Sequence, residues 1–299
     1  MRRYKPEGKL ISTPENRAAL SDIGSIMQAY SKKTTLEARV LLCDNEHNLH
    51  LDLGPVRGII PRNEGAIGIE DGSVRDIALI SRVNKPVSFR IIGFEEDNYG
   101  EKIAILSRRE IQQDCYNEYI SQLSPGDVID AKITHIEGFG AFADIGAGLI
   151  ALMPIDAISV SRIPHPNVRF STGDDIKAIV KDIAPDGKIT LSHKELLGTW
   201  EQNAQNFSPG QTVPGIIRSV EKYGIFVELA PNLAGLAEPK EDVEVGQTAA
   251  VYIKSILPHK MKIKLVLVDS VGGEKQKIKS KYFITDGNVA DWDYSSFGR

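Results

Sequence analysis

Gly138-Phe-Gly-Ala-Phe142 returns 84 positions later as Lys222-Tyr-Gly-Ile-Phe226, and the stretches on both sides repeat at the same offset. The preceding Leu123-Ser-Pro-Gly-Asp127 matches Phe207-Ser-Pro-Gly-Gln211, and the following Ala151-Leu-Met-Pro154 matches Gly235-Leu-Ala-Glu238. A constant offset across gapless stretches indicates a repeated structural module.

A less similar copy of the module lies earlier in the chain. Gly58-Ile-Ile-Pro61 stands 93 positions before Ala151, whereas Leu106-Ser-Arg-Arg-Glu110 stands 85 positions before Leu191-Ser-His-Lys-Glu195. The changing offset implies inserted loop residues around 63–76 and 97–100. The 299 residues are therefore expected to form three modules of roughly 70–75 residues, a size that can fold, instead of two larger domains.

The local texture of the modules is β-like. In the first module, short apolar runs at 38–42, 49–53, 58–60, 77–80, 87–92 and 103–106 predict five or six strands. Residues 13–31 show helical apolar spacing, with Ser12 or Thr13 as a cap and Pro14 at the first helical position. Residues 108–122 and 194–206 lack proline and are predicted as helical connectors.

Composition excludes several classes of protein. No run of about 18 apolar residues is present, so no membrane partner is expected. The basic start has no apolar stretch behind it and predicts no secretory signal. Cys43 and Cys115 are far apart, which favours a reduced, cytoplasmic protein. Because no metal-ligand cluster, phosphate-binding loop or nucleophile motif occurs, we expect no enzyme, metal, cofactor or small-molecule substrate.

The second module has an ordered set of motifs: Gly126-Asp-Val-Ile-Asp130, Gly138-Phe-Gly-Ala-Phe142, Pro164-His-Pro166 and Lys188-Ile-Thr-Leu-Ser192. In this order and spacing it resembles the S-one RNA-binding domain, the repeat of the largest small-subunit ribosomal protein. The third module resembles it well and the first more weakly. The resemblance implies a five-stranded Greek-key barrel of the OB type for each module.

The predicted fold class is therefore mainly β, with three tandem OB-fold barrels of the S-one type, short helical connectors and an N-terminal helix. The expected divisions are an N-terminal helical extension (1–35), a degenerate barrel (36–110), a connector (111–123), a barrel (124–195), a connector (196–207), a barrel (208–270) and a basic, then aromatic, tail (271–299).

Two aromatic pairs are the main candidates for RNA contact. Phe139 and Phe142, like Tyr223 and Phe226, are three positions apart, so a regular strand would turn them to opposite faces. A bend or bulge at Gly140 would bring both to one surface, where exposed aromatics stack on unpaired bases. The resemblance implies the same four residues as base-stacking aromatics. The alternative is that these aromatics, like most in strands, belong to the core.

Lysines near the aromatic pairs are candidates for phosphate contact. The net charge is −4, which argues against a generally basic nucleic-acid binder, but eight lysines against two acids lie between Lys254 and Lys281. The lysines at 260, 262 and 264 alternate, which predicts one basic strand face or, alternatively, a merely solvated one. The resemblance adds a basic residue before the last strand. The candidate phosphate contacts are Lys132, Lys188, Lys222, Lys254, Lys260, Lys262 and Lys264.

The copies depart from the family pattern in informative ways. The histidine that the resemblance implies after the third strand is replaced by Pro61, Pro154 and Glu238. The first module has His47 and His50 where the aromatics should be. By resemblance such leading repeats often contact protein, although exposed histidines on a barrel rim need no function.

Two functions follow as expectations. The first is non-catalytic binding of single-stranded RNA, mRNA above all, in association with the small ribosomal subunit and its proteins during translation. Modules two and three would hold the RNA in tandem. The second is a protein-interaction adaptor on the ribosome or the RNA-decay machinery, for which RNA contact is incidental. Trp200, Trp292 and the other aromatics of the tail are predicted to pack and not to stack on bases.

Overall fold

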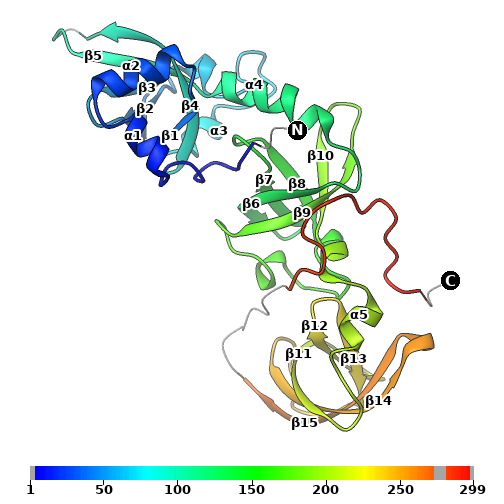
Figure 1. Cartoon of the computed structure of the whole chain (residues 1–299). Coiled ribbons are helices and arrows are strands. Elements are labelled where there is room, and N and C mark those ends of the chain that lie inside the picture. Colours follow the sequence, from blue (N-terminus) through cyan, green and yellow to red (C-terminus); the bar gives the residue numbers. More distant parts are fainter. Residues whose placement is uncertain (1–3, 98, 273–280, 297–299) are drawn as a thin grey trace. The chain divides into compact units, whose positions relative to one another are not determined.

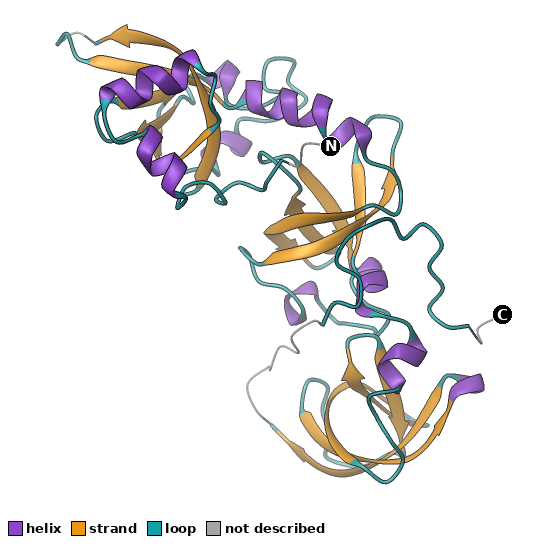
Figure 2. Ribbon diagram, viewed as in Figure 1, coloured by secondary structure: helices purple, strands orange, loops and turns teal. Residues whose placement is uncertain are grey.

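The structure is a computed structural model that describes residues 4–97, 99–272 and 281–296. In these ranges the chain forms three closed five-stranded barrels with short helices between them (Figures 1 and 2). The prediction of a mainly β protein with three tandem barrels and an N-terminal helix is confirmed. The chain divides into two compact units. The first contains residues 1–123 and 144–150, and the second contains residues 124–143 and 151–299.

The first barrel has the strand order β1-β2-β3-β5-β4. Its neighbouring strands are antiparallel except for the parallel pair β3 and β5. Leu36, Leu49, Ile60, Phe89 and Leu106 fill its interior and are almost fully buried. The strands are β1 (Leu36–Cys43), β2 (Leu49–Asp52), β3 (Arg57–Ile60), β4 (Pro86–Glu96) and β5 (Lys102–Ser107).

The predicted N-terminal helix is two helices, α1 (Pro14–Ala19) and α2 (Ile23–Ser31). Thr13 caps the first through its side chain and Asp22 caps the second, each by accepting a main-chain N–H three residues on. The prediction of one continuous helix was wrong because Asp22 is a strong N-cap and starts a new helix within the apolar pattern.

One predicted strand of the first module is a helix. Ile77–Ile80 forms α3, in which only Leu79 is fully buried while Ile77 is 63% exposed. The run belongs to the inserted loop between β3 and β4, and in the described part of the chain it pairs with no strand, while Leu79 packs into the core of the barrel. The β propensity of its isoleucines is therefore overridden by tertiary context. The remaining short elements of this unit are η1 (Arg62–Glu64), α4 (Arg109–Glu118) and η2 (Ile120–Gln122).

The second barrel has the order β10-β8-β7-β6-β9. Its strands are β6 (Val128–Glu137), β7 (Gly140–Asp144), β8 (Ile150–Pro154), β9 (Asp175–Ile183) and β10 (Ile189–Ser192). Short helical turns follow β8 and β10: η3 (Ile155–Ala157), η4 (Pro166–Val168), η5 (Lys194–Leu197) and α5 (Trp200–Ala204). Thr199 and Gln202 form a capping box that starts α5, so the second connector is helical as predicted.

The third barrel has the order β11-β12-β13-β15-β14, the same as the first. Its elements are β11 (Thr212–Glu221), β12 (Gly224–Ala230), β13 (Leu233–Ala237), β14 (Thr248–Leu257), η6 (Pro258–Lys260) and β15 (Lys262–Val271). Ile217, Ile225, Val227, Val251 and Ile253 are fully buried in its core.

The last strand ends differently in the third barrel, and the sequence explains why. In the first two barrels a Ser-x-x-Glu motif closes the strand: Ser107 Oγ accepts the N–H of Glu110, and Ser192 Oγ bonds the Glu195 carboxylate. These contacts start a helical turn. The third barrel has Val266 at that position, so β15 continues to Val271.

The second unit also contains a buried ion-paired triad that joins barrels two and three. The carboxylate of Glu228 on β12 accepts from Arg169 Nη2 at 2.5 Å and from Nε of Arg218. The side chains of Arg169 and Glu228 are completely buried. Asn232 adds bonds from its Nδ2 to the main-chain oxygens of Lys194 (2.7 Å) and Gly198 (2.9 Å).

The described part of the C-terminal tail packs on the second unit. The hydroxyl of Tyr282 lies 3.1 Å from Nε2 of the buried His193, and the Tyr294 hydroxyl donates to the Asn232 main-chain oxygen at 2.6 Å. Burial lowers the pKa of His193 to about 4. Trp200 is 2% exposed and Trp292 contacts Tyr294, so these aromatics are packing residues, as predicted. Among the described residues no helix is long and apolar enough to cross a membrane.

Candidate RNA-binding face

The two aromatic pairs lie on the outer surfaces of barrels two and three with the same geometry. Phe139 is 59% exposed and meets the half-buried Phe142 edge to face, with ring centroids 6.0 Å apart and planes at 89°. Tyr223 is 67% exposed and meets Phe226 with centroids 6.1 Å apart and planes at 86°. Neither barrel buries its pair in the core, so each pair presents an open aromatic surface.

A tight turn, and not a bulge at the glycine, brings each pair to one surface. In barrel three, Glu221 pairs with Gly224, so Lys222 and Tyr223 form a two-residue hairpin turn. Tyr223 therefore stands outside the strand alternation, and Phe226 faces outward from within β12. Gly138 and Phe139 hold the same place between β6 and β7. Both aromatics of the pair reach one surface, as expected. The bulge in this part of barrel three is in β11, between Ile217 and Ser219, and not at Gly224.

The glycine after each aromatic has a different task from the predicted bend. A Cβ on Gly140 would lie 2.5 Å from the main-chain oxygen of Met153, and one on Gly224 would lie 2.6 Å from that of Ala237. Only glycine lets the neighbouring strand approach so closely. The close approach holds the aromatic turn against the third strand of its barrel.

Across barrel three, the outward side chains form a row that ends in a lysine. Phe226 pairs in register with Leu236, and Leu236 pairs with Lys264. Leu236 is 36% exposed, so an apolar surface connects the aromatic pair to the positive charge. A base stacked on the pair and a phosphate at the lysine would both contact this row.

The candidate lysines of barrel three are available for phosphates. Lys222, Lys254, Lys262 and Lys264 are exposed and form no ion pair with any described residue. Ile263, between the last two, and Leu265, directly after them, are buried, as the alternation predicts. Lys260 is not part of this strand face, because it lies in η6 and Met261 follows with a left-handed backbone. Lys275, Lys277 and Lys279 lie outside the described residues.

The lysines of barrel two are less available. Lys188 bonds Asp186 in its own turn, with Nζ 2.6 Å from the carboxylate oxygen, and this contact raises the pKa of Lys188. Lys132 is half-buried. The candidate lysines of barrel two are therefore ion-paired or half-buried, whereas those on the strand face and turn of barrel three are exposed and form no ion pair with a described residue.

Comparison with known proteins agrees with this geometry. Residues 122–194 match the family model of the S1 RNA binding domain. The chain is 30% identical over 234 residues to the small ribosomal subunit protein bS1 homolog of Bacillus subtilis, which covers 73% of this chain and 58% of that protein. It is 27% identical over 306 residues to bS1 of Mycolicibacterium smegmatis, covering 96% of this chain and 61% of that protein. Over most of its length the chain is therefore similar to bS1 proteins.

The chain thus spans less than two thirds of the length of these bS1 relatives. Among solved structures, it is similar to a multidomain protein with nucleic acid binding domains from Streptococcus pneumoniae, with 13% identity, a TM-score of 0.26 and coverage of 79% of this chain and 74% of that chain.

The first barrel lacks the aromatic pair of the other two. His50 occupies the place of Phe142 and Phe226, and its Nε2 lies 2.8 Å from the Asp44 carboxylate. Its register partners are the aliphatic Leu42 and Ile59. His47 lies in a turn with a positive φ of 64°. The corresponding face of barrel one is therefore aliphatic, with its histidine already bonded to an acid.

One ring on the barrel two face was missed by the sequence reasoning. His135 on β6 stacks beside Phe142, with centroids 6.1 Å apart and planes at 27°. The burial pattern of β6 loses its alternation after Ile133, since Thr134 is half-buried and His135 exposed. Alternation along β6 therefore could not predict which face His135 occupies. The 84-residue offset could have done so, because it matches His135 to Ser219, and Ser219 is in register with Phe226.

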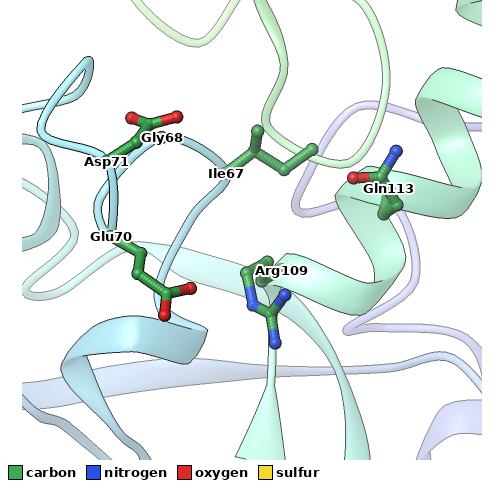
Figure 3. Close-up of a pocket in the computed structure, with 6 residues that line it drawn as sticks. All are labelled: Ile67, Gly68, Glu70, Asp71, Arg109 and Gln113. Carbon is green, nitrogen blue, oxygen red and sulfur yellow. The ribbon is translucent and has the colours of Figure 1, made fainter.

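One pocket of the first unit is lined by none of the aromatic-pair residues. This shallow pocket is formed by the inserted loop and α4, and Figure 3 shows the side chains of Glu70 and Arg109 extending toward each other across it. Arg109 also bonds Glu64 at 2.6 Å. Opposite charges already meet there, and among the described residues no group of three or more His, Cys, Asp or Glu could hold a metal.

Proposed function

We propose that this chain is a non-catalytic binder of single-stranded RNA, including mRNA, that acts in the cytoplasm with the small ribosomal subunit in translation. The observation that carries the proposal is the pair of exposed, edge-to-face aromatics at equivalent places in two barrels. The S1 match over residues 122–194 and the bS1 homology support it.

The chemistry of the face fits an unpaired strand better than a duplex. Exposed rings stack on bases only when those bases are not paired, and each stacked base contributes about 1–3 kcal/mol. The free lysines of barrel three then neutralise phosphates along the strand. Two such barrels on one chain raise the effective concentration of the second contact once the first has formed.

A direct test measures the affinity of the full chain for oligo-uridine by fluorescence anisotropy. The double variant Phe139→Ala with Tyr223→Ala is expected to weaken binding at least 20-fold at moderate salt, since two stacking platforms are lost. Tyr99→Ala is the matched control, because Tyr99 is 92% exposed but lies in a loop of barrel one. Unchanged affinity in the double variant would refute the proposal.

A second candidate function is that of a protein-interaction adaptor. The observation that favours it is the exposed aliphatic surface of the first unit, where Leu42, Ile77 and Ile80 are 48%, 63% and 43% exposed. Co-sedimentation with small subunits that survives RNase treatment, together with no measurable affinity for free RNA, would select the adaptor. Loss of co-sedimentation after RNase would reject it.

A further inference from the structure

His135 makes the barrel two face a three-ring surface. Its imidazole stacks on one side of Phe142 at 6.1 Å, and Phe139 meets Phe142 on the same exposed surface at 6.0 Å. The His135 side chain is 63% exposed. Three neighbouring rings from β6, β7 and the turn between them thus form one open patch.

The imidazole is held in place by a neighbouring carboxylate. His135 Nε2 lies 2.6 Å from Oε1 of Glu137, two residues along β6. An exposed pair of this kind adds little to folding stability, but it favours the ring orientation in which Nε2 faces the Glu137 carboxylate. A ring that is already oriented loses less rotational freedom when a ligand stacks on it.

The other parts of the imidazole remain open. Nδ1 has no hydrogen-bond partner among the described residues, and the ring is not covered by the barrel. The negative Glu137 carboxylate lies beside Nε2 and would repel a phosphate there, whereas the ring face and Nδ1 remain open to a base. The equivalent residue of barrel three is Ser219, which has no ring.

Resting on the RNA-binding function proposed above, we propose that His135 is a third base-stacking residue, so that barrel two contacts one more unpaired base than barrel three. The two barrels then bind the RNA in different ways. Barrel two binds chiefly through bases, because it has three rings while its candidate lysines are ion-paired or half-buried, and barrel three combines two rings with free lysines.

The test uses the full chain, oligo-uridine and four variants. His135→Ala is expected to weaken binding about fivefold or more, the effect of losing one stacked base. His135→Phe keeps a ring and is expected to stay within twofold of the unaltered chain. The last two variants are Phe139→Ala alone and Phe139→Ala combined with Ser219→His. Phe139→Ala weakens barrel two so that barrel three dominates binding, and the ring added by Ser219→His is expected to increase the affinity relative to Phe139→Ala alone. Circular dichroism melts confirm that each variant is folded.

Nuclear magnetic resonance adds a readout that a purely structural role would not change. The ring protons of His135 are expected to shift upfield on addition of the oligonucleotide, because a stacked base shields them. If His135→Ala binds like the unaltered chain while Phe139→Ala binds weakly, the role of His135 is overturned and the RNA-binding proposal stands. Equal weakness of His135→Phe and His135→Ala would also overturn it. If Phe139→Ala with Tyr223→Ala changes nothing, the RNA-binding proposal itself fails.

Discussion

Removal of the Glu228 carboxylate is expected to be among the most damaging single changes in the second unit. Glu228 lies between Arg169 and Arg218, and the exposed fractions of the three side chains are 0%, 0% and 8% in that order. Glu228→Ala would leave two guanidinium groups buried without their counter-charge. Breaking a buried pair in this way costs about 3–5 kcal/mol, because the remaining charge has lost its compensation.

The assay is urea unfolding followed by the fluorescence of Trp200, which is 2% exposed in the same unit, with Trp292→Phe as the common background. Glu221→Ala is the matched control, since Glu221 is exposed on the neighbouring strand, and is expected to change stability by no more than about 0.5 kcal/mol. A combined Arg169→Met, Glu228→Leu variant is expected to recover part of the loss by removing the charges together. A loss below about 1 kcal/mol for Glu228→Ala would refute the reasoning.

Three further predictions concern pH, packing and salt. Burial lowers the pKa of His193 to about 4, so the unfolded chain binds this proton more tightly than the folded chain. The free energy of unfolding is therefore highest above about pH 6.5 and decreases as the pH falls toward 4. The free energy of unfolding should be about 2 kcal/mol lower at pH 5 than at pH 7, a difference that His193→Gln should remove. Gly140→Ala should lower the unfolding free energy by about 1–3 kcal/mol because the added Cβ has no space. Gly93→Ala is the control, since the space around Gly93 is open, and equal urea midpoints for the two variants would contradict this prediction. Lys262→Ala with Lys264→Ala should reduce the slope of log affinity for oligo-uridine against log salt by about 1.4, two phosphate contacts at roughly 0.7 each, and an unchanged slope would exclude these lysines as phosphate contacts.

Repetition made much of the fold predictable. The 84-residue offset places equivalent residues in equivalent strands, so Phe226 and Phe142 were correctly expected on one kind of surface. The lysines at 262 and 264 face outward because the residues that alternate with them, Ile263 and Leu265, are core residues. In these cases a period of two, supported by a second copy, determined the face of each side chain.

Local patterns failed where neighbouring elements decided the outcome. Ile77–Ile80 has strand-like composition but forms a helix, whose Leu79 packs into the core of the barrel. Lys260 continues the lysine alternation but lies in a turn. The helix expected over 13–31 divides at Asp22, whose capping bond outweighs the continuing apolar pattern.

By itself, the sequence determined that this chain contains repeated β modules with paired aromatics at matched positions, because identity of residue and spacing survive in the linear order. The tertiary structure decided which rings meet. His135, Phe142 and Phe139 come together only when β6 and β7 close into the barrel. Glu228 meets Arg169, 59 positions away, and Arg218 on β11 only when the chain has folded around it. Contacts between strands depend on register and curvature, and one extra residue in a bulge changes the face of all side chains that follow.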